Sequence, residues 1–360
     1  MHYARTFLIL AAAAIAGGCA TVGYYAQAVG GQLQILTSTR PISELLDDTR
    51  ADAEMPDVAT PLAPELKARL ATILRVRDFA TRALALPDNN SFRVYAEIDR
   101  SHVAWNVVAT SEFSFTPKVW CFPVAGCVPY RGYFSHQSAT KFAATLTQDR
   151  LDVRIAGVAA YSTLGWFSDP VFSSQLRRND TDIAALIFHE LAHQQVYRRG
   201  DGAFNESFAT AVEDEGLRRW LAESNDAAAL ASYQHDKTRR AQFVELLLKY
   251  RARLEDLYAR PLPLEPMRAA KADEFKALRA EYVVLRQQWG GHNGYDAWFA
   301  QDLNNAHLAS VGLYHQYVPA FQKILADVQG DLPAFYNMAR VLSKLPASER
   351  AARFEQLASK

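Results

Sequence analysis

The chain has 360 residues, of which 49% are hydrophobic and 22% are charged, and this composition is typical of a folded globular protein. Its 39 basic and 39 acidic residues balance, so the formal net charge is zero. Because no basic excess is available to neutralise phosphates, the composition argues against nucleic-acid binding.

The N-terminus has the layout of a secretory signal. Arg5 precedes an apolar run from Phe7 to Ala16, and small residues then lead to Cys19. The apolar run is about half as long as the roughly 20 residues that a membrane-spanning helix needs, so no permanent transmembrane anchor is predicted. A buried N-terminal core helix is the alternative, and the flanking arginine and small residues argue against it.

The end of this segment resembles the lipobox of bacterial lipoproteins. Ala16 stands where leucine is usual, but Gly17 and Gly18 precede the cysteine as small residues do in that motif. The resemblance implies that residues 1–18 are a lipoprotein signal peptide and that Cys19 becomes the lipidated first residue. Because the next residue is not the aspartate that retains such proteins in the inner membrane, it also implies export and lipid anchoring to the outer membrane of a Gram-negative bacterium, facing the periplasm.

Residues 19–90 are predicted to form an N-terminal helical segment. Residues 22–50 include an apolar stretch that favours a helix despite a glycine pair, and the acidic, proline-containing residues 47–64 are typical of a linker. In residues 63–87, apolar side chains recur at a spacing of three to four, which predicts an amphipathic helix.

The sequence period changes after residue 90. In residues 91–115, apolar and polar residues alternate and β-favouring residues are frequent, so two strands are predicted. A further strand is predicted in residues 152–161. A loop then ends at Pro170, and Asp180 to Asp182 are suited to capping the helix that follows.

Cys121 and Cys127 lie six positions apart in a loop that is rich in aromatic residues, proline and glycine. In an exported protein, a disulfide between them is the natural interpretation. Zinc binding by the pair is the alternative, although the spacing is wider than in C-x2-4-C sites and the chain has no second cysteine pair.

The sequence IFHELAHQQVY carries the pattern of a catalytic metal site. His189 and His193 are four positions apart, which places both imidazoles on one face of a helix with roughly 5–6 Å between their Cβ atoms, so both can bind one metal ion. Glu190 lies beside that face, where it can act as a general base on a water molecule without being a ligand. Two core histidines without a metal are the alternative, and the apolar helical context argues against it.

A catalytic zinc needs three protein ligands and one open position, so a third ligand is required. Glu206, thirteen positions after His193 in an acidic helix, is the candidate. Glu213 lies seven residues further on, about two helical turns, and could orient a ligand histidine as an outer carboxylate. The alternative for Glu213 is a solvated surface acid beside Asp214 and Glu215.

HELAHQ and FNESFATAVE resemble the HExxHQ and NEGFA-x-x-VE segments of zinc aminopeptidases of the gluzincin clan. The resemblance implies one zinc per chain, held by His189, His193 and Glu206, with Glu190 as the base. Two features depart from the pattern, because the interval between the motifs is shorter than in the aminopeptidase N group and a serine replaces the glycine after the glutamate. The sequence also lacks a GAMEN-like segment for recognition of the substrate amine.

Over nearly its full length, the sequence also resembles a bacterial family of lipoproteins called putative aminopeptidases. This resemblance implies a peptide as the substrate. The segments that carry it are the lipobox with GYYAQAVGGQLQIL, WCFPVAGCVPYRGYF, YSTLGWFSDP, HELAHQQVY with FNESFA, and LNNAHLASVGLYHQYVPAF.

A donor for the oxyanion that develops during peptide hydrolysis is still required. Tyr314 is the candidate, because a tyrosine or a histidine supplies this hydrogen bond in related zincins. The alternatives are Tyr161, Tyr317, His307 and His315, and core packing is the ordinary role of each.

An aminopeptidase must also bind the free ammonium group of its substrate, and a carboxylate near the metal is the most effective partner for a desolvated cation. Asp169 is preferred for this role over Glu213. It lies in the GWFSDP loop, which follows a strand just before the metal helix, where zincins align an extended substrate beside an edge strand. An ordinary connecting turn is the alternative for this loop.

The combined patterns predict an α+β fold that is predominantly helical. A zincin-like catalytic region with a small sheet is expected in residues 91–230, and a helical C-terminal region in residues 231–360. The predicted function is that of a zinc-dependent metallopeptidase, by preference an aminopeptidase. The alternatives are a periplasmic zinc endopeptidase and a non-catalytic lipoprotein that zinc only stabilises, and Glu190 argues against the latter because a structural site needs no base. The sequence does not fix the substrate or the oligomeric state.

Overall fold

The structure of the protein is a computed structural model, and it describes residues 23–25, 27–47, 62–122, 126–160, 162–309, 311 and 317–358. Within them the chain is mostly helical with small sheets, which confirms the predicted predominantly helical α+β class. The predicted signal peptide and Cys19 lie outside the described residues, as does most of the predicted linker.

The helices and strands agree with the main sequence patterns. One helix covers the segment predicted at 63–87, and strands lie in both segments where they were predicted. The helices are residues 27–38, α2 (Ile42–Leu46), α3 (Pro64–Leu84), α4 (His136–Gln148), α5 (Asp180–Gln195), α6 (Gly202–Glu223), α7 (Ala227–Tyr258), α8 (Leu264–Gln288), α9 (Asp296–Phe299), α10 (Asn305–Ala309), α12 (Val318–Asp327), α13 (Leu332–Lys344) and α14 (Ala347–Ala358). The strands are β1 (Thr39–Pro41), β2 (Val94–Ala96), β3 (Ala104–Ser111), β4 (Trp120–Phe122), β5 (Gly126–Val128), β6 (Arg131–Tyr133), β7 (Leu151–Val158) and β8 (Val171–Phe172).

Helix α5 carries the HExxH motif, and Asn179 sets its start. The side chain of Asn179 accepts a hydrogen bond from the backbone N–H of Asp182 at 2.8 Å, so the cap lies one residue before the predicted position. Asp180 and Asp182 lie instead in the first turn, where the helix dipole favours acidic side chains. The face of α5 toward the core is apolar and consists of Ile183, Ala184, Ile187, Phe188, Leu191 and Ala192.

Helix α6 packs closely against α5 and α3, and Gly216 permits this approach. A Cβ atom at this position would lie 2.7 Å from Cδ2 of Phe188 and 2.8 Å from Cδ1 of Leu84. Only glycine avoids both clashes. The contact therefore fixes the α6 face that carries Glu206 and Glu213 at a short distance from the HExxH helix.

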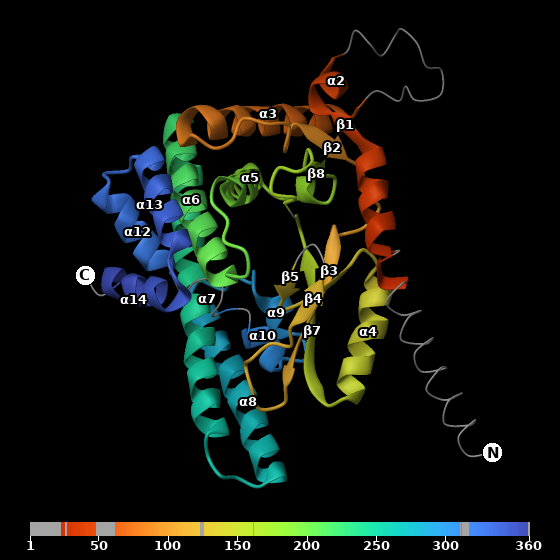
Figure 1. The fold of residues 1–360 in the computed structure, drawn as a ribbon, viewed down its shortest axis with the longest axis vertical. Coiled ribbons are helices and arrows are strands. Elements are labelled where there is room, and N and C mark those ends of the chain that lie inside the picture. Colours follow the sequence, from red (N-terminus) through yellow and green to blue (C-terminus); the bar gives the residue numbers. More distant parts are fainter. Residues whose placement is uncertain are drawn as a thin grey trace, which may run out of the picture.

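The strands form three small sheets. In the first, β3 pairs antiparallel with β6 and β7, and α4 packs against it (Figure 1). In the second, β2 pairs antiparallel with β1 and parallel with β8. The third is the β4–β5 hairpin, where Cys121 and Cys127 face each other and are joined by a disulfide, which confirms the predicted pairing.

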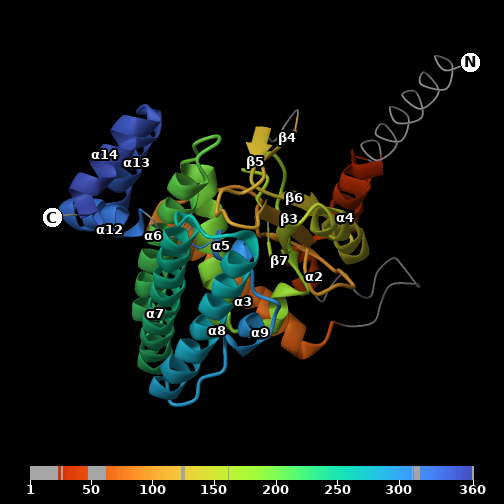
Figure 2. The same cartoon turned by 90° about the horizontal axis from the view of Figure 1, so that it is seen from below.

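The C-terminal half contains a long pair of helices, α7 and α8, and a separate group, α12–α14, that lies beside α6 (Figures 1 and 2). The largest apolar core joins side chains from α3, α5, α6 and α12–α14. This core therefore includes side chains from both sides of the expected region boundaries at residues 90 and 230. The division of the chain into these regions stays a prediction. None of the helices in the described part of the chain combines the length and apolar character needed to span a bilayer.

Candidate metal centre and cleft

Three side chains from α5 and α6 converge on one point. One potential ligand atom from each of His189, His193 and Glu206 lies within 4.8 Å of the others. Nε2 of His189 is 3.2 Å from Oε2 of Glu206, and Nε2 of His193 is 3.7 Å from Oε1 of Glu206. Two ligands bound to a tetrahedral zinc at about 2.0–2.2 Å lie roughly 3.3–3.6 Å apart. The nitrogen, nitrogen and oxygen donors therefore fit one zinc ion without a change of fold.

The outer ring nitrogen of His189 has a carboxylate partner. Nδ1 of His189 is 3.0 Å from Oε2 of Glu213, and the guanidinium of Arg240 donates a hydrogen bond to Oε1 of Glu213 at 3.2 Å. Such a carboxylate fixes the ring orientation and leaves Nε2 free to bind a metal. Arg240 comes from α7, and no local sequence pattern connects it with the HExxH helix.

Burial and the mutual charges of this cluster shift the pKa values of its residues. Burial raises the pKa of Glu190 to about 7, although the nearby His189 acts in the opposite direction. It lowers the pKa of His193 to about 4, which favours the neutral imidazole that binds metals. For His189, burial would lower the pKa, but the hydrogen bonds to Glu206 and Glu213 outweigh it, so the pKa lies well above its ordinary value.

The cluster forms part of the wall of a cleft of about 870 Å³ between α5 and the β6–β3–β7 sheet. His189, Glu190, His193 and Glu206 all line this cleft, and aromatic rings supply much of its remaining surface. A second pocket of about 310 Å³ reaches His189 and Glu190 from the other flank. The aromatic residues of the cleft are Tyr24, Tyr25, Phe122, Tyr130, Tyr133, Phe134 and Tyr197.

Two of these tyrosines have phenols near the third candidate ligand. Burial raises the pKa of both Tyr130 and Tyr197, and the negative charge of Glu206 contributes to each shift. Tyr197 follows the end of α5, and its ring centroid lies 6.4 Å from that of His193, so the extended turn at Val196 brings it to the cluster. Tyr130 follows the disulfide hairpin, and only the fold brings it to the cleft.

The predicted oxyanion donors do not appear in the described cleft. Tyr314, Tyr161 and His315 lie outside the described residues. Tyr317 stacks on Phe354 with 4.4 Å between ring centroids. His307 is buried, and its ring nitrogens lie within hydrogen-bond distance of Asn304 and Gln301. Both side chains therefore have packing roles, and neither is among the residues that line the cleft.

Asp169, the predicted partner of the substrate ammonium, accepts hydrogen bonds from its own loop. Its side chain is buried, and its two carboxylate oxygens accept hydrogen bonds from the backbone N–H of Thr163 at 3.0 and 3.1 Å. The hydroxyl of Ser162 donates a third at 3.2 Å. Asp169 thus closes the loop that precedes it, and it is not among the residues that line the cleft. Nε2 of Gln194, the residue after His193, lies 3.5 Å from its Oδ2. A contact between Asp169 and a substrate ammonium stays a prediction.

The comparisons with known proteins give one match. A model of the protein family described as putative aminopeptidase matches residues 23–354. No curated protein and no solved structure matches the chain. The family description indicates a peptidase and hence a peptide substrate.

Proposed function

We propose that this chain, which belongs to the putative aminopeptidase family, is a zinc-dependent metallopeptidase with a zincin-like catalytic region and one zinc per chain. The observation that carries the proposal is the convergence of His189, His193 and Glu206 beside Glu190 on the wall of a large cleft. The donor distances suit one tetrahedral zinc. A carboxylate next to the ligands favours catalysis over a metal site that only stabilises the fold.

Each residue of the cluster has a distinct part in the proposed reaction. Zinc held by the three ligands would supply Lewis acidity toward the scissile carbonyl and toward a water molecule. Glu190 accepts the proton of the attacking water and passes it to the leaving amine. Tyr130 and Tyr197 line the same cleft and are our candidates for the hydrogen bond to the developing oxyanion, while Tyr314 stays a candidate from the sequence alone.

Aminopeptidase action is the first candidate, because the family description supports it. It requires a partner for the substrate ammonium, and both predicted carboxylates already have partners, since Asp169 contacts its own loop and Glu213 contacts His189 and Arg240. Endopeptidase action is the second candidate. The observation that favours it is a pocket on each flank of His189 and Glu190, which would let a peptide extend in both directions.

One experiment tests the chemistry and separates these two candidates. A library of peptides is digested as matched pairs, with a free or an acetylated N-terminus, before and after removal of metal with a chelator. We expect hydrolysis to disappear on metal removal and to return with about one equivalent of zinc. An aminopeptidase would cleave only the free peptides, because acetylation removes the cation that it binds.

The pattern of products decides the outcome. Equal cleavage of the free and acetylated members of each pair at internal bonds would assign endopeptidase action and leave the zinc chemistry intact. Full hydrolysis by protein that contains no metal would overturn the metallopeptidase proposal. The products are identified by mass spectrometry.

We also propose, from the lipobox resemblance, that Cys19 anchors the mature protein to the outer membrane on its periplasmic side. Replacement of Cys19 by Ala removes the lipidated thiol, so the exported variant should move from the membrane fraction to the soluble fraction. Fractionation followed by immunoblotting measures this shift. A variant that remains with the membrane as fully as the native protein would contradict lipid anchoring at this position.

A further inference from the structure

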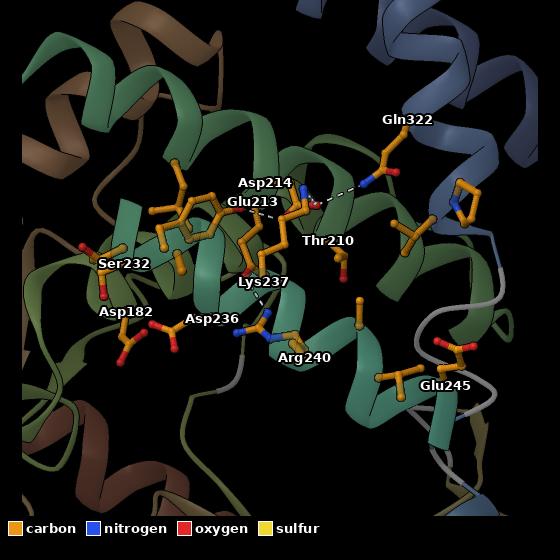
Figure 3. A pocket seen from close by; sticks show the side chains of 18 of the residues that line it. Asp182, Thr210, Glu213, Asp214, Ser232, Asp236, Lys237, Arg240, Glu245 and Gln322 are labelled. Carbon is orange, nitrogen blue, oxygen red and sulfur yellow. Dashed lines mark hydrogen bonds and ion pairs between the residues drawn. The ribbon is translucent and has the colours of Figure 1, made fainter. Parts of the chain in front are cut away.

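A second large cavity lies on the α7 side of the metal helix. Its walls come from the first half of α5, the middle of α6, the first two-thirds of α7 and the start of α12 (Figure 3). The volume is about 840 Å³, which is within the range of small-ligand and peptide-binding sites. Much of the wall is apolar and consists of Ala185, Leu217, Ala241, Val244, Leu248, Val318 and Pro319. We call it the α5–α7 cavity.

The α5–α7 cavity adjoins the proposed catalytic centre. It shares Asp182, Ala185, Glu213 and Arg240 with the smaller pocket that reaches the metal cluster, and that pocket also contains Glu190. A peptide held with its scissile bond at Glu190 could therefore direct a neighbouring side chain past the Glu213–Arg240 pair into the cavity.

The ionisable lining of the α5–α7 cavity is net negative, with five carboxylates against three cations. The carboxylates are Asp182, Glu213, Asp214, Asp236 and Glu245, and the cations are Lys237, Arg240 and Lys249. Each cation already has an acidic partner, and the pairs are Arg240–Glu213, Lys237–Asp214 and Lys249–Glu281. Asp182 and Glu245 form no ion pair within the described residues.

Two of the carboxylates approach each other from different helices. Asp182 on α5 and Asp236 on α7 lie together at one end of the α5–α7 cavity (Figure 3). Burial raises the pKa of Asp182 and the charge of Asp236 adds to the shift, against the lowering effects of Arg178 and Arg240. Asp236 forms an ion pair with Arg239 on its own helix. Both residues are exposed, so a cation in the cavity can reach their carboxylates.

We propose that the α5–α7 cavity is a substrate subsite that selects a lysine or arginine side chain, with the cationic end between Asp182 and Asp236. The proposal rests on the proposed peptidase function, because it concerns the peptide on which that site acts. An amphipathic cation suits the cavity better than an anion or a purely apolar group, since its stem covers apolar wall while its charge meets the carboxylates.

The spacing along α5 suits this occupant. Asp182 precedes His189 by seven residues, which is about two helical turns, so both side chains lie on the same face roughly 10 Å apart along the axis. Ala185 and Leu186 lie between them on that stretch of helix and line the pocket. The methylene stem of a basic side chain can pack on these residues while its charged end approaches Asp182.

The test is equilibrium binding, which does not depend on hydrolysis. Zinc-loaded full-length protein with the change Glu190→Gln is titrated calorimetrically with alanine pentapeptides in which one position in turn is lysine or norleucine. Norleucine keeps the stem of lysine and lacks its charge. At the position that enters the subsite, we expect the lysine peptide to bind at least roughly tenfold more tightly than the norleucine peptide. The further change Asp182→Asn should reduce the ratio of the lysine-peptide affinity to the norleucine-peptide affinity toward one. It should leave the affinity for the norleucine peptide unchanged.

Asp180→Asn is the matched control, because Asp180 lies in the same first turn of α5, pairs with Arg69 and does not line the α5–α7 cavity. This variant should keep the full preference for lysine, and Asp236→Asn should lower it as a second, independent variant. A lysine-to-norleucine affinity ratio near one at every position would contradict the proposed subsite. So would a high ratio that is unchanged in both Asp182→Asn and Asp236→Asn. Lysine-selective binding by protein whose native form hydrolyses no peptide would instead overturn the proposed function and leave the subsite standing.

Discussion

Replacement of Glu190 by Gln is expected to lower kcat/KM for peptide hydrolysis by roughly 10²- to 10⁴-fold while the protein keeps its zinc. The amide has nearly the shape of the carboxylate but cannot take a proton from the attacking water. Glu190 is not one of the three residues whose donor atoms converge, so its replacement leaves the proposed ligand set complete.

Three measurements on the Glu190→Gln variant separate loss of the base from loss of the site. Zinc content by mass spectrometry should equal that of the native protein, and the melting temperature of the zinc-loaded form should change little. Steady-state kinetics with a fluorogenic peptide then reports the chemical step. Activity close to native in the Gln variant would show that another group acts as the base, whereas loss of zinc would mean that Glu190 is itself a ligand.

The HExxH motif illustrates which part of such a site can be predicted from sequence. His189, Glu190 and His193 belong to one helix, so their relative positions follow from helical geometry alone. The same reasoning predicts that Glu206 and Glu213 share one face of a second helix, and in the structure a carboxylate oxygen of each lies within 3.2 Å of a ring nitrogen of His189. Local periodicity was sufficient because each group of residues lies within a few turns of one helix.

The contacts that sequence reasoning missed join distant parts of the chain. Tyr130 reaches the cleft from the loop after the disulfide hairpin, and Arg240 reaches Glu213 from α7. No helical or strand period connects these residues with the motif, because their proximity depends on how whole elements pack. Asp169 is a different case, because its carboxylate accepts hydrogen bonds from the turn before it, which the sequence pattern did not indicate, and its contact with a substrate stays a prediction.

Because α6 approaches α5 closely, His189, His193 and Glu206 converge although the interval between the two motifs is shorter than in the aminopeptidase pattern. Ser207, which replaces the glycine of that pattern, is fully buried, and its hydroxyl accepts a hydrogen bond from the backbone N–H of Tyr317 at 3.1 Å. The serine therefore ties the start of α12 to the helix that carries Glu206. This link gives the substitution a structural role next to the proposed third ligand.

Removal of the third ligand by Glu206→Ala is expected to weaken zinc binding by more than roughly 100-fold, which exceeds the 10- to 100-fold loss typical of outer carboxylates. The change deletes the only oxygen donor of the convergent set and leaves two imidazoles. Because bound metal stabilises the folded state in proportion to the logarithm of its affinity, the zinc-dependent rise in melting temperature should shrink as well.

Two further variants on α6 calibrate this result. Glu213→Gln removes the charge that orients His189 without removing a ligand, so zinc affinity should fall by roughly 10- to 100-fold. Glu215→Gln is the control, because this carboxylate pairs with Arg218 and Arg219 and has no contact with the metal cluster, so zinc affinity should stay unchanged. Competition with a chromophoric chelator measures all three affinities. Native zinc content in Glu206→Ala would place the third ligand elsewhere, whereas equal losses in Glu206→Ala and Glu213→Gln would mean that both carboxylates act on the metal only through His189.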